Sequence, residues 1–139
     1  MQMETPLVQP AGSRPRPQPV VVLVVEDDAA VRELVSELLT REGYTVLTAS
    51  HVHEAHRHLR EHAVDVVVLD LLLQDEQGRL VLDRPGRSGA PAVVIISGLP
   101  VPSAIADHPQ VAAILPKPFD LEELLAAVDK AARWQRPDL

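Results

Sequence analysis

The chain has 139 residues, of which 46% are hydrophobic and 24% charged, and this composition is typical of one globular domain rather than of a disordered chain. Its 13 basic and 20 acidic residues give a net charge of −7, so we expect no basic face that could bind nucleic acid. The three aromatic side chains are too few to form a platform on which bases stack. Cysteine is absent, which excludes disulfides, cysteine-ligated metals and a thiol nucleophile.

The N-terminal segment differs in composition from the rest of the chain. Residues 1–19 hold five prolines and no apolar periodicity, so we expect a disordered, proline-rich arm. The arm contains no signal-peptide core. No apolar run in the chain approaches the roughly 18 residues of a membrane span. A cytoplasmic protein with no membrane segment is therefore expected.

A strand and a helix follow the arm. The β-branched run Val20–Val25 predicts a strand that is buried on both faces. Asp28 is expected to cap the next helix and Gly43 to end it. The apolar stripe of that helix is predicted to consist of Val31, Leu34, Val35, Leu38 and Leu39.

Further strands and helices alternate along the remaining sequence. The predicted strands are Tyr44–Ala49, Val64–Leu69, Ala92–Ser97 and Val111–Leu115. The predicted helices are His53–His62, a short piece at Arg79–Asp83, about one turn near Ser103–Asp107, and Leu121–Arg133. The last helix is expected to begin with a capping box of Asp120 and Glu123. Its residues predicted to face inward are Leu121, Leu124, Leu125 and Val128. This alternation predicts an α/β fold, a doubly wound five-stranded parallel sheet with helices on both faces.

Polar side chains stand where these strands end. Glu26 and Asp27 follow the first strand, Asp70 the third, Ser97 ends the fourth, and Lys117 follows the fifth. Ligands of such sheets bind at the carboxyl ends of the strands. Three carboxylates gathered there repel one another, and Mg²⁺, which prefers oxygen ligands, would relieve the repulsion. A carboxylate beside Mg²⁺ can also attack a phosphoryl donor and form an aspartyl phosphate.

Four segments resemble the receiver domain of two-component response regulators. They are Val-Leu-Val-Val-Glu26-Asp27-Asp28, Val-Val-Val-Leu-Asp70, Ser97-Gly98 and Lys117-Pro118-Phe119, and the similar region runs from about Val20 to Arg133. The resemblance implies a flavodoxin-like sheet of strand order 2-1-3-4-5, here with shortened third and fourth helices. It implies a receiver domain at residues 20–134, followed by a C-terminal tail at 135–139.

The resemblance also assigns a role to each residue of the site. Asp70 would be the phosphoacceptor, Ser97 would donate to the phosphoryl group, and Lys117, in a cis peptide with Pro118, would pair with it. Mg²⁺ would be bound by Asp27, Glu26, Asp70 and the backbone carbonyl of Leu72. Leu72 and Leu99 would lie beside the path of the attacking water and slow dephosphorylation. Ile114 stands where the family has an aromatic residue, so an altered output surface and a loop-like segment at Gly98–Gln110 are expected.

The implied function is that of a phosphoacceptor in a two-component phosphorelay. Its partners would be a histidine kinase or a histidine phosphotransfer protein, with no nucleic acid and no membrane. Because six residues follow Arg133, a single-domain regulator is expected, a monomer or weak dimer that signals by protein contact. It would not be an enzyme beyond self-phosphorylation and slow self-dephosphorylation.

Other interpretations remain open. Asp70 and Glu26 could be turn or helix caps, Ser97 a turn residue and Lys117 a surface lysine. The chain could be a degenerate receiver that binds partners without phosphorylation. A Mg²⁺-dependent aspartyl-phosphate phosphatase is disfavoured, because Leu72 stands where such enzymes have an Asp. Five histidines between residues 51 and 62 are expected to form a solvated flank rather than a metal site.

Overall fold

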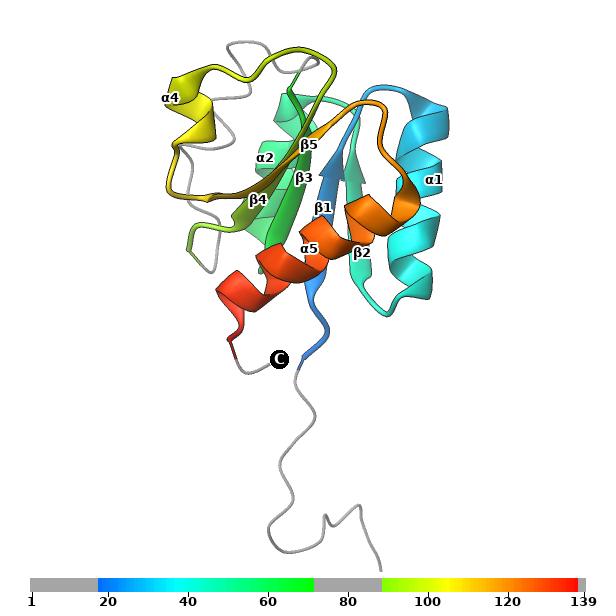
Figure 1. Cartoon of the computed structure of the whole chain (residues 1–139). Coiled ribbons are helices and arrows are strands. Elements are labelled where there is room, and N and C mark those ends of the chain that lie inside the picture. The colour runs from blue at the N-terminus through cyan, green and yellow to red at the C-terminus, as the bar shows by residue number, and fades with distance from the viewer. Residues whose placement is uncertain (1–17, 72–88, 138–139) are drawn as a thin grey trace, which may run out of the picture.

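The computed structural model describes residues 18–71 and 89–137. Its strands are β1 (Val21–Val25), β2 (Thr45–Ala49), β3 (Val66–Asp70), β4 (Ala92–Ser97) and β5 (Val111–Pro116). Its helices are α1 (Ala29–Arg41), α2 (Val52–Glu61), α4 (Ser103–Ala106) and α5 (Leu121–Gln135). The strands pair in parallel in the order β2-β1-β3-β4-β5 (Figure 1), which is the order that the resemblance implied.

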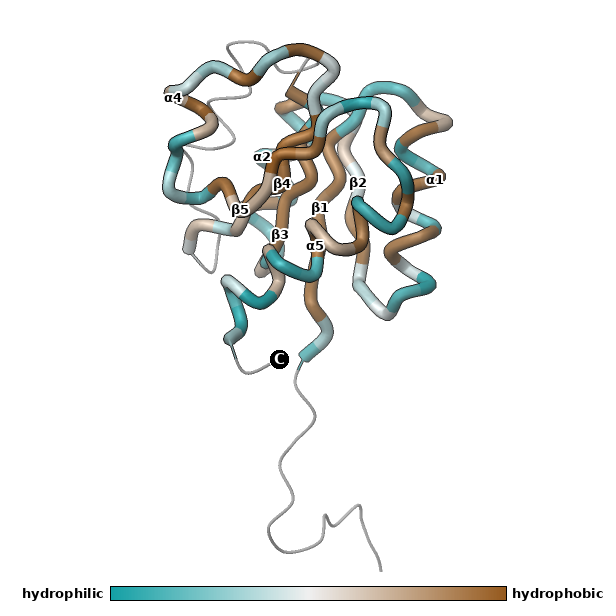
Figure 2. Tube along the Cα trace, viewed as in Figure 1, coloured by the Kyte–Doolittle hydropathy of each residue, from teal (hydrophilic) through white to brown (hydrophobic). Residues whose placement is uncertain are grey.

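Helices cover both faces of the sheet. α1 and α5 pack on one face, where Leu39 and Val128 belong to a single buried cluster with Val22 and Val24. α2 and α4 lie on the opposite face, in a second cluster. The central strands are the most hydrophobic part of the trace, and the helices carry polar residues on their outer sides (Figure 2). The continuous apolar runs of the sequence thus correspond to strands that are covered on both sides.

The ends of α1 follow the predicted capping chemistry. Oδ1 of Asp28 accepts hydrogen bonds from the backbone N–H groups of Ala30 and Val31, at 2.9 and 3.2 Å. Gly43, just past the helix, has a φ of +97°, which a residue with a side chain rarely adopts. The capping box of Asp120 and Glu123 at the start of α5 is also present.

Two residues predicted to face the core are exposed. Leu34 of α1 has 54% of its surface accessible, and Leu121 of α5 has 40%. Each residue of an α-helix turns by about 100°, so Leu34 lies that far around the helix from its buried neighbour Val35. Leu121 is the first residue of α5, at the N-terminal end of the helix. The apolar stripes are therefore narrower than predicted.

The helical turn between β4 and β5 has the predicted length. α4 has four residues, begins after Pro102 and ends before Pro109, and only Ile105 of the helix is buried. Proline lacks an N–H group, which restricts a longer helix here. The predicted helix Arg79–Asp83, most of the proline-rich arm and the last two residues of the tail lie outside the described residues.

An ion pair that the sequence did not indicate fastens the end of the sheet opposite the acidic residues. The guanidinium of Arg136 donates to both carboxylate oxygens of Asp65, at 3.3 and 3.0 Å, and to the carbonyls of Gln18 and Pro19. Oδ2 of Asp65 also accepts from the N–H of Val21 at 2.8 Å. This pair joins the end of α5 to the start of β1, and α5 itself extends two residues beyond the predicted Arg133.

Among the helices of the described part of the chain, none combines the length and the apolar character that crossing a membrane requires.

Candidate functional site

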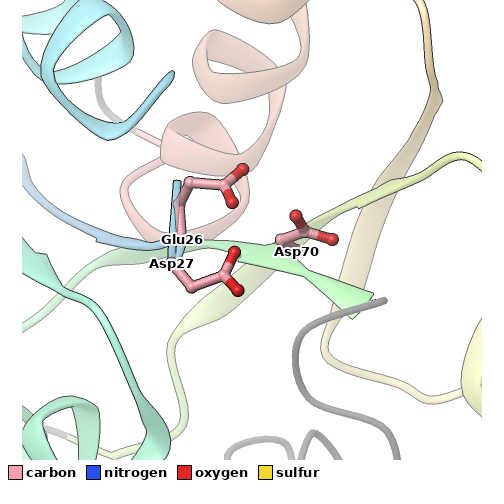
Figure 3. A group of neighbouring side chains, drawn as sticks. All are labelled: Glu26, Asp27 and Asp70. Carbon is pink, nitrogen blue, oxygen red and sulfur yellow. The ribbon is translucent and has the colours of Figure 1, made fainter. Parts of the chain in front are cut away.

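Three carboxylates meet at the carboxyl end of the sheet. Glu26 and Asp27 follow β1, and Asp70 is the last residue of the neighbouring β3, so parallel pairing of the two strands brings them together. Each offers an oxygen, and these oxygens lie within 4.8 Å of one another. Figure 3 shows Glu26 and Asp27 directed toward the end of β3, where Asp70 stands. Glu26 and Asp70 are each only 4% exposed, whereas Asp27 is exposed.

Lys117 supplies the cation of the site. Its Nζ donates a hydrogen bond to Oδ2 of Asp70 at 3.0 Å and lies 4.0 Å from Oε1 of Glu26. The backbone N–H of Lys117 donates to the carbonyl of Ser97 at 2.8 Å, which ties the residue to the end of β4. The peptide bond between Lys117 and Pro118 is cis, as the resemblance implied.

The pKa values of Glu26 and Lys117 are shifted within the site. Burial raises the pKa of Glu26 to about 7, the charge of Asp70 and a hydrogen bond with it add to this effect, and the N–H of Asp28 and the charge of Lys117 oppose it. Burial lowers the pKa of Lys117, but the hydrogen bond and charge of Asp70 and the charges of the other two acids outweigh burial and raise it. The site therefore favours bound positive charge beyond that of its one lysine.

The donor set suits Mg²⁺. All three side chains offer carboxylate oxygens, which are hard ligands, and one of them is exposed at the opening of the site. Mg²⁺ is usually held by one or two carboxylates and keeps several waters, so three such groups within 4.8 Å are sufficient. The fourth predicted ligand, the carbonyl of Leu72, lies outside the described residues.

Ser97 stands at the end of β4 as predicted, but its hydroxyl hydrogen bonds are local. Oγ donates to the carbonyl of Leu99 at 2.7 Å and accepts from the N–H of Leu99 at 3.1 Å. The Ser97 side chain is buried, whereas Leu99 is 62% exposed. The sequence indicated the position of the hydroxyl but not this pairing.

Arg32 is a contributor that the sequence analysis missed. Its Nη1 donates to the backbone carbonyl of Glu26 at 2.8 Å and to that of Asp27 at 3.3 Å. The available indication was its position in α1, one helical turn after the Asp28 cap. That position alone does not show that the side chain folds back over the acidic turn.

The prediction of a solvated histidine flank was wrong for two of the five histidines. His56, in α2, is buried. His58 is partly buried, and its Nε2 lies 2.9 Å from the carbonyl of Thr48. The other three are exposed. Across residues 18–71 and 89–137, the acids at the strand ends are the one cluster with metal-ligand geometry, so the histidines form no such site there.

Comparisons with known proteins find relatives in one family. A family model described as the response regulator receiver domain matches residues 22–129. The chain is similar to the transcriptional regulatory protein GlrR of Escherichia coli K12, with 32% identity over 123 residues that make up 86% of this chain and 28% of GlrR. It is also similar to the response regulator MprA of Mycolicibacterium vanbaalenii, with 37% identity over 86% of this chain and 53% of that protein. The chain thus spans between about a quarter and about half the length of these curated relatives.

Solved structures share the fold. The CheY-like receiver domain protein from Methanospirillum hungatei aligns with a TM-score of 0.75 and 22% identity, over 88% of this chain and all of that one. The non-phosphorylated HemR receiver domain from Leptospira biflexa aligns with a TM-score of 0.69 and 26% identity, over 86% of this chain and 99% of that one.

Proposed function

The chain belongs to the response regulator receiver family. On that premise we propose that Asp70 accepts a phosphoryl group and that Glu26, Asp27 and Asp70 bind Mg²⁺. The single observation that carries the proposal is the contact of 3.0 Å between Lys117 Nζ and Asp70 Oδ2 beside the acidic cluster. A turn cap or a surface lysine needs no such partner. The arrangement holds the positive charge that a transferred phosphoryl group requires.

The chemistry is a transfer between two nucleophiles. A carboxylate oxygen of Asp70 attacks phosphorus, the bond from phosphorus to the donor's nitrogen or oxygen breaks, and the donor leaves with the electron pair of that bond. Glu26, Asp27 and Asp70 would hold Mg²⁺, which would supply positive charge for the phosphoryl oxygens. Lys117 releases Asp70 Oδ2 and pairs with one phosphoryl oxygen, and the hydroxyl of Ser97 donates to another.

The donor and the output are part of the proposal. We infer a histidine kinase or a histidine phosphotransfer protein as the donor and protein contact as the output, from a monomer or weak dimer in the cytoplasm. The chain is proposed to have no enzymatic turnover beyond its own phosphorylation and slow dephosphorylation. The word "transcriptional" in the name of GlrR describes that longer protein, and the net charge of −7 supports no direct role for nucleic acid here.

The test is phosphorylation with a small donor. Acetyl phosphate and Mg²⁺ should add one phosphoryl group to the wild type by intact mass, and Asp70→Asn should remain unmodified. Asp107→Asn serves as the matched control, since Asp107 is an exposed aspartate after α4, and it should be modified like the wild type. Modification of Asp70→Asn would overturn the assignment. An unmodified wild type would favour the degenerate receiver.

A further inference from the structure

The side chain of Arg32 binds two successive carbonyls of the acidic turn between β1 and α1. Its side-chain Nη1 donates to the carbonyls of Glu26 and Asp27, at 2.8 and 3.3 Å. Its backbone N–H donates to the carbonyl of Asp28 at 2.9 Å. One side chain near the start of α1 therefore contacts the backbone of two of the three acids.

We propose that Arg32 is a positioning residue for the divalent cation, which it never touches. Packing does not fix the side chain of Asp27, because that side chain is exposed, so the direction of its carboxylate depends on the backbone that Arg32 holds. Glu26 is buried and is held from its other side, where its Oε2 accepts from the N–H of Asp28. This inference rests on the Mg²⁺ site of the proposed function and extends it to a residue outside the donor set.

The charge of Arg32 and its hydrogen bonds have opposite effects on cation binding. A positive charge bound to the backbone of Glu26 and Asp27 lowers the attraction of the site for Mg²⁺, so removal of the charge alone should tighten binding. Removal of the hydrogen bonds frees the turn and should weaken binding, as the loss of outer partners of metal ligands does in other sites, by about 10- to 100-fold. Tighter Mg²⁺ binding after substitution of Arg32 would therefore indicate that its charge dominates, and weaker binding that its hydrogen bonds dominate.

The experiment measures Mg²⁺ affinity by isothermal titration calorimetry on the whole unphosphorylated chain. Arg32→Met keeps most of the side-chain bulk and removes both the charge and the donors, and we expect its dissociation constant to rise about tenfold. Arg41→Met is the matched control on the same helix. It changes the net charge equally but breaks only the exposed pair with Glu37, so its affinity should stay within about twofold of the wild type.

Arg32→Lys tests the geometry of the donors. A lysine keeps the opposing charge but has one ammonium in place of the guanidinium, so its dissociation constant should rise above that of the wild type. Thermal unfolding in EDTA reports the fold of each variant separately. If Arg32→Met fails to fold, Arg32→Lys decides the matter, because wild-type affinity in that variant overturns the proposal.

Each result bears on a different statement. Equal or tighter binding by folded Arg32→Met overturns the positioning role and leaves the proposed function intact. Absence of Mg²⁺ binding by both the wild type and Arg41→Met overturns the metal site, and this inference with it. Weaker binding by Arg32→Met alone, with unchanged stability in EDTA, supports the inference.

Discussion

Replacing Glu26 with Gln should stabilise the metal-free protein. The carboxyl group of Glu26 is buried beside Asp70, which with burial raises its pKa from 4.5 to about 7. At 1.36 kcal/mol per pKa unit, and with half of the group still protonated at pH 7, this shift costs the fold on the order of 2–3 kcal/mol. Glutamine removes that cost, and its amide oxygen can still accept the hydrogen bond from the N–H of Asp28.

The gain should depend on pH with a defined sign. Below about pH 4.5 the carboxyl group is protonated in both the folded and the unfolded state, so wild type and variant should differ little. Between about 4.5 and 7 the unfolded state loses its proton while the folded state keeps it, and the stability of the wild type falls relative to the variant. Above about pH 7 the difference should level off.

Urea denaturation in EDTA at pH 4.5 and pH 8 measures this difference. Glu33→Gln is the control, because Glu33 is exposed on α1, and its free energy of unfolding should change by less than about 0.5 kcal/mol at either pH. Addition of Mg²⁺ should then raise the melting temperature of the wild type more than that of Glu26→Gln, because the ion binds the folded state. A Glu26→Gln variant no more stable than the wild type at pH 8 would refute the idea that the buried carboxylate strains the site.

Three further predictions follow from single contacts. Arg136→Gln should lower the free energy of unfolding by about 1–3 kcal/mol, since it leaves Asp65 partly buried without its bidentate partner, and a urea midpoint equal to that of the wild type would contradict this. Asp120→Ala removes the capping box of α5 and should cost about 1 kcal/mol by the same measurement. Leu99→Asn should shorten the lifetime of the phosphoryl group, because a polar side chain two positions past Ser97 can orient an attacking water; unchanged decay of radiolabelled protein would show that Leu99 does not shield the site.

The sheet and the strand-end residues were predictable because their causes are local. The β-branched runs that form β1 and β3 can be buried on both faces. Glu26 directly follows β1 and Asp70 ends β3, at the same edge of the sheet. The caps Asp28 and Asp120 act within three residues, so their roles follow from the sequence. The order of the strands came from the family resemblance, since periodicity alone does not determine which strands are neighbours.

The contacts that the sequence did not indicate depend on distant positions or on side-chain direction. Arg136 and Asp65 are 71 residues apart, and no periodic pattern connects them. His58 lies on a polar helix, yet its ring turns toward the carbonyl of Thr48 at the sheet. Arg32 can extend into solvent or fold back on the turn, and only the three-dimensional structure shows that it folds back. Each case is a choice among side-chain conformations that residue type does not determine.

Phosphorylation of Asp70 should first change the hydrogen bonds between the hydroxyl of Ser97 and the backbone of Leu99. A hydroxyl has one proton, and Ser97 donates it to the carbonyl of Leu99 at 2.7 Å. Donation to a phosphoryl group on Asp70 requires that this bond break, and the weaker bond from the Leu99 N–H at 3.1 Å depends on the same oxygen. Pro100 and Pro102 follow and have no N–H groups that could replace the hydroxyl as donor to the Leu99 carbonyl.

The Leu99 amide should therefore exchange its hydrogen faster in the phosphorylated protein. The loss of one hydrogen bond, worth about 1 kcal/mol, corresponds to about a fivefold change in exchange rate. Ser97→Ala should show the fast rate without phosphorylation, whereas Ser103→Ala, an exposed serine at the start of α4, should exchange at Leu99 like the unphosphorylated wild type. Equal protection of Leu99 in the wild type before and after phosphorylation, measured by amide exchange, would mean that Ser97 keeps its bond to Leu99 and that the phosphoryl group takes its donors from elsewhere.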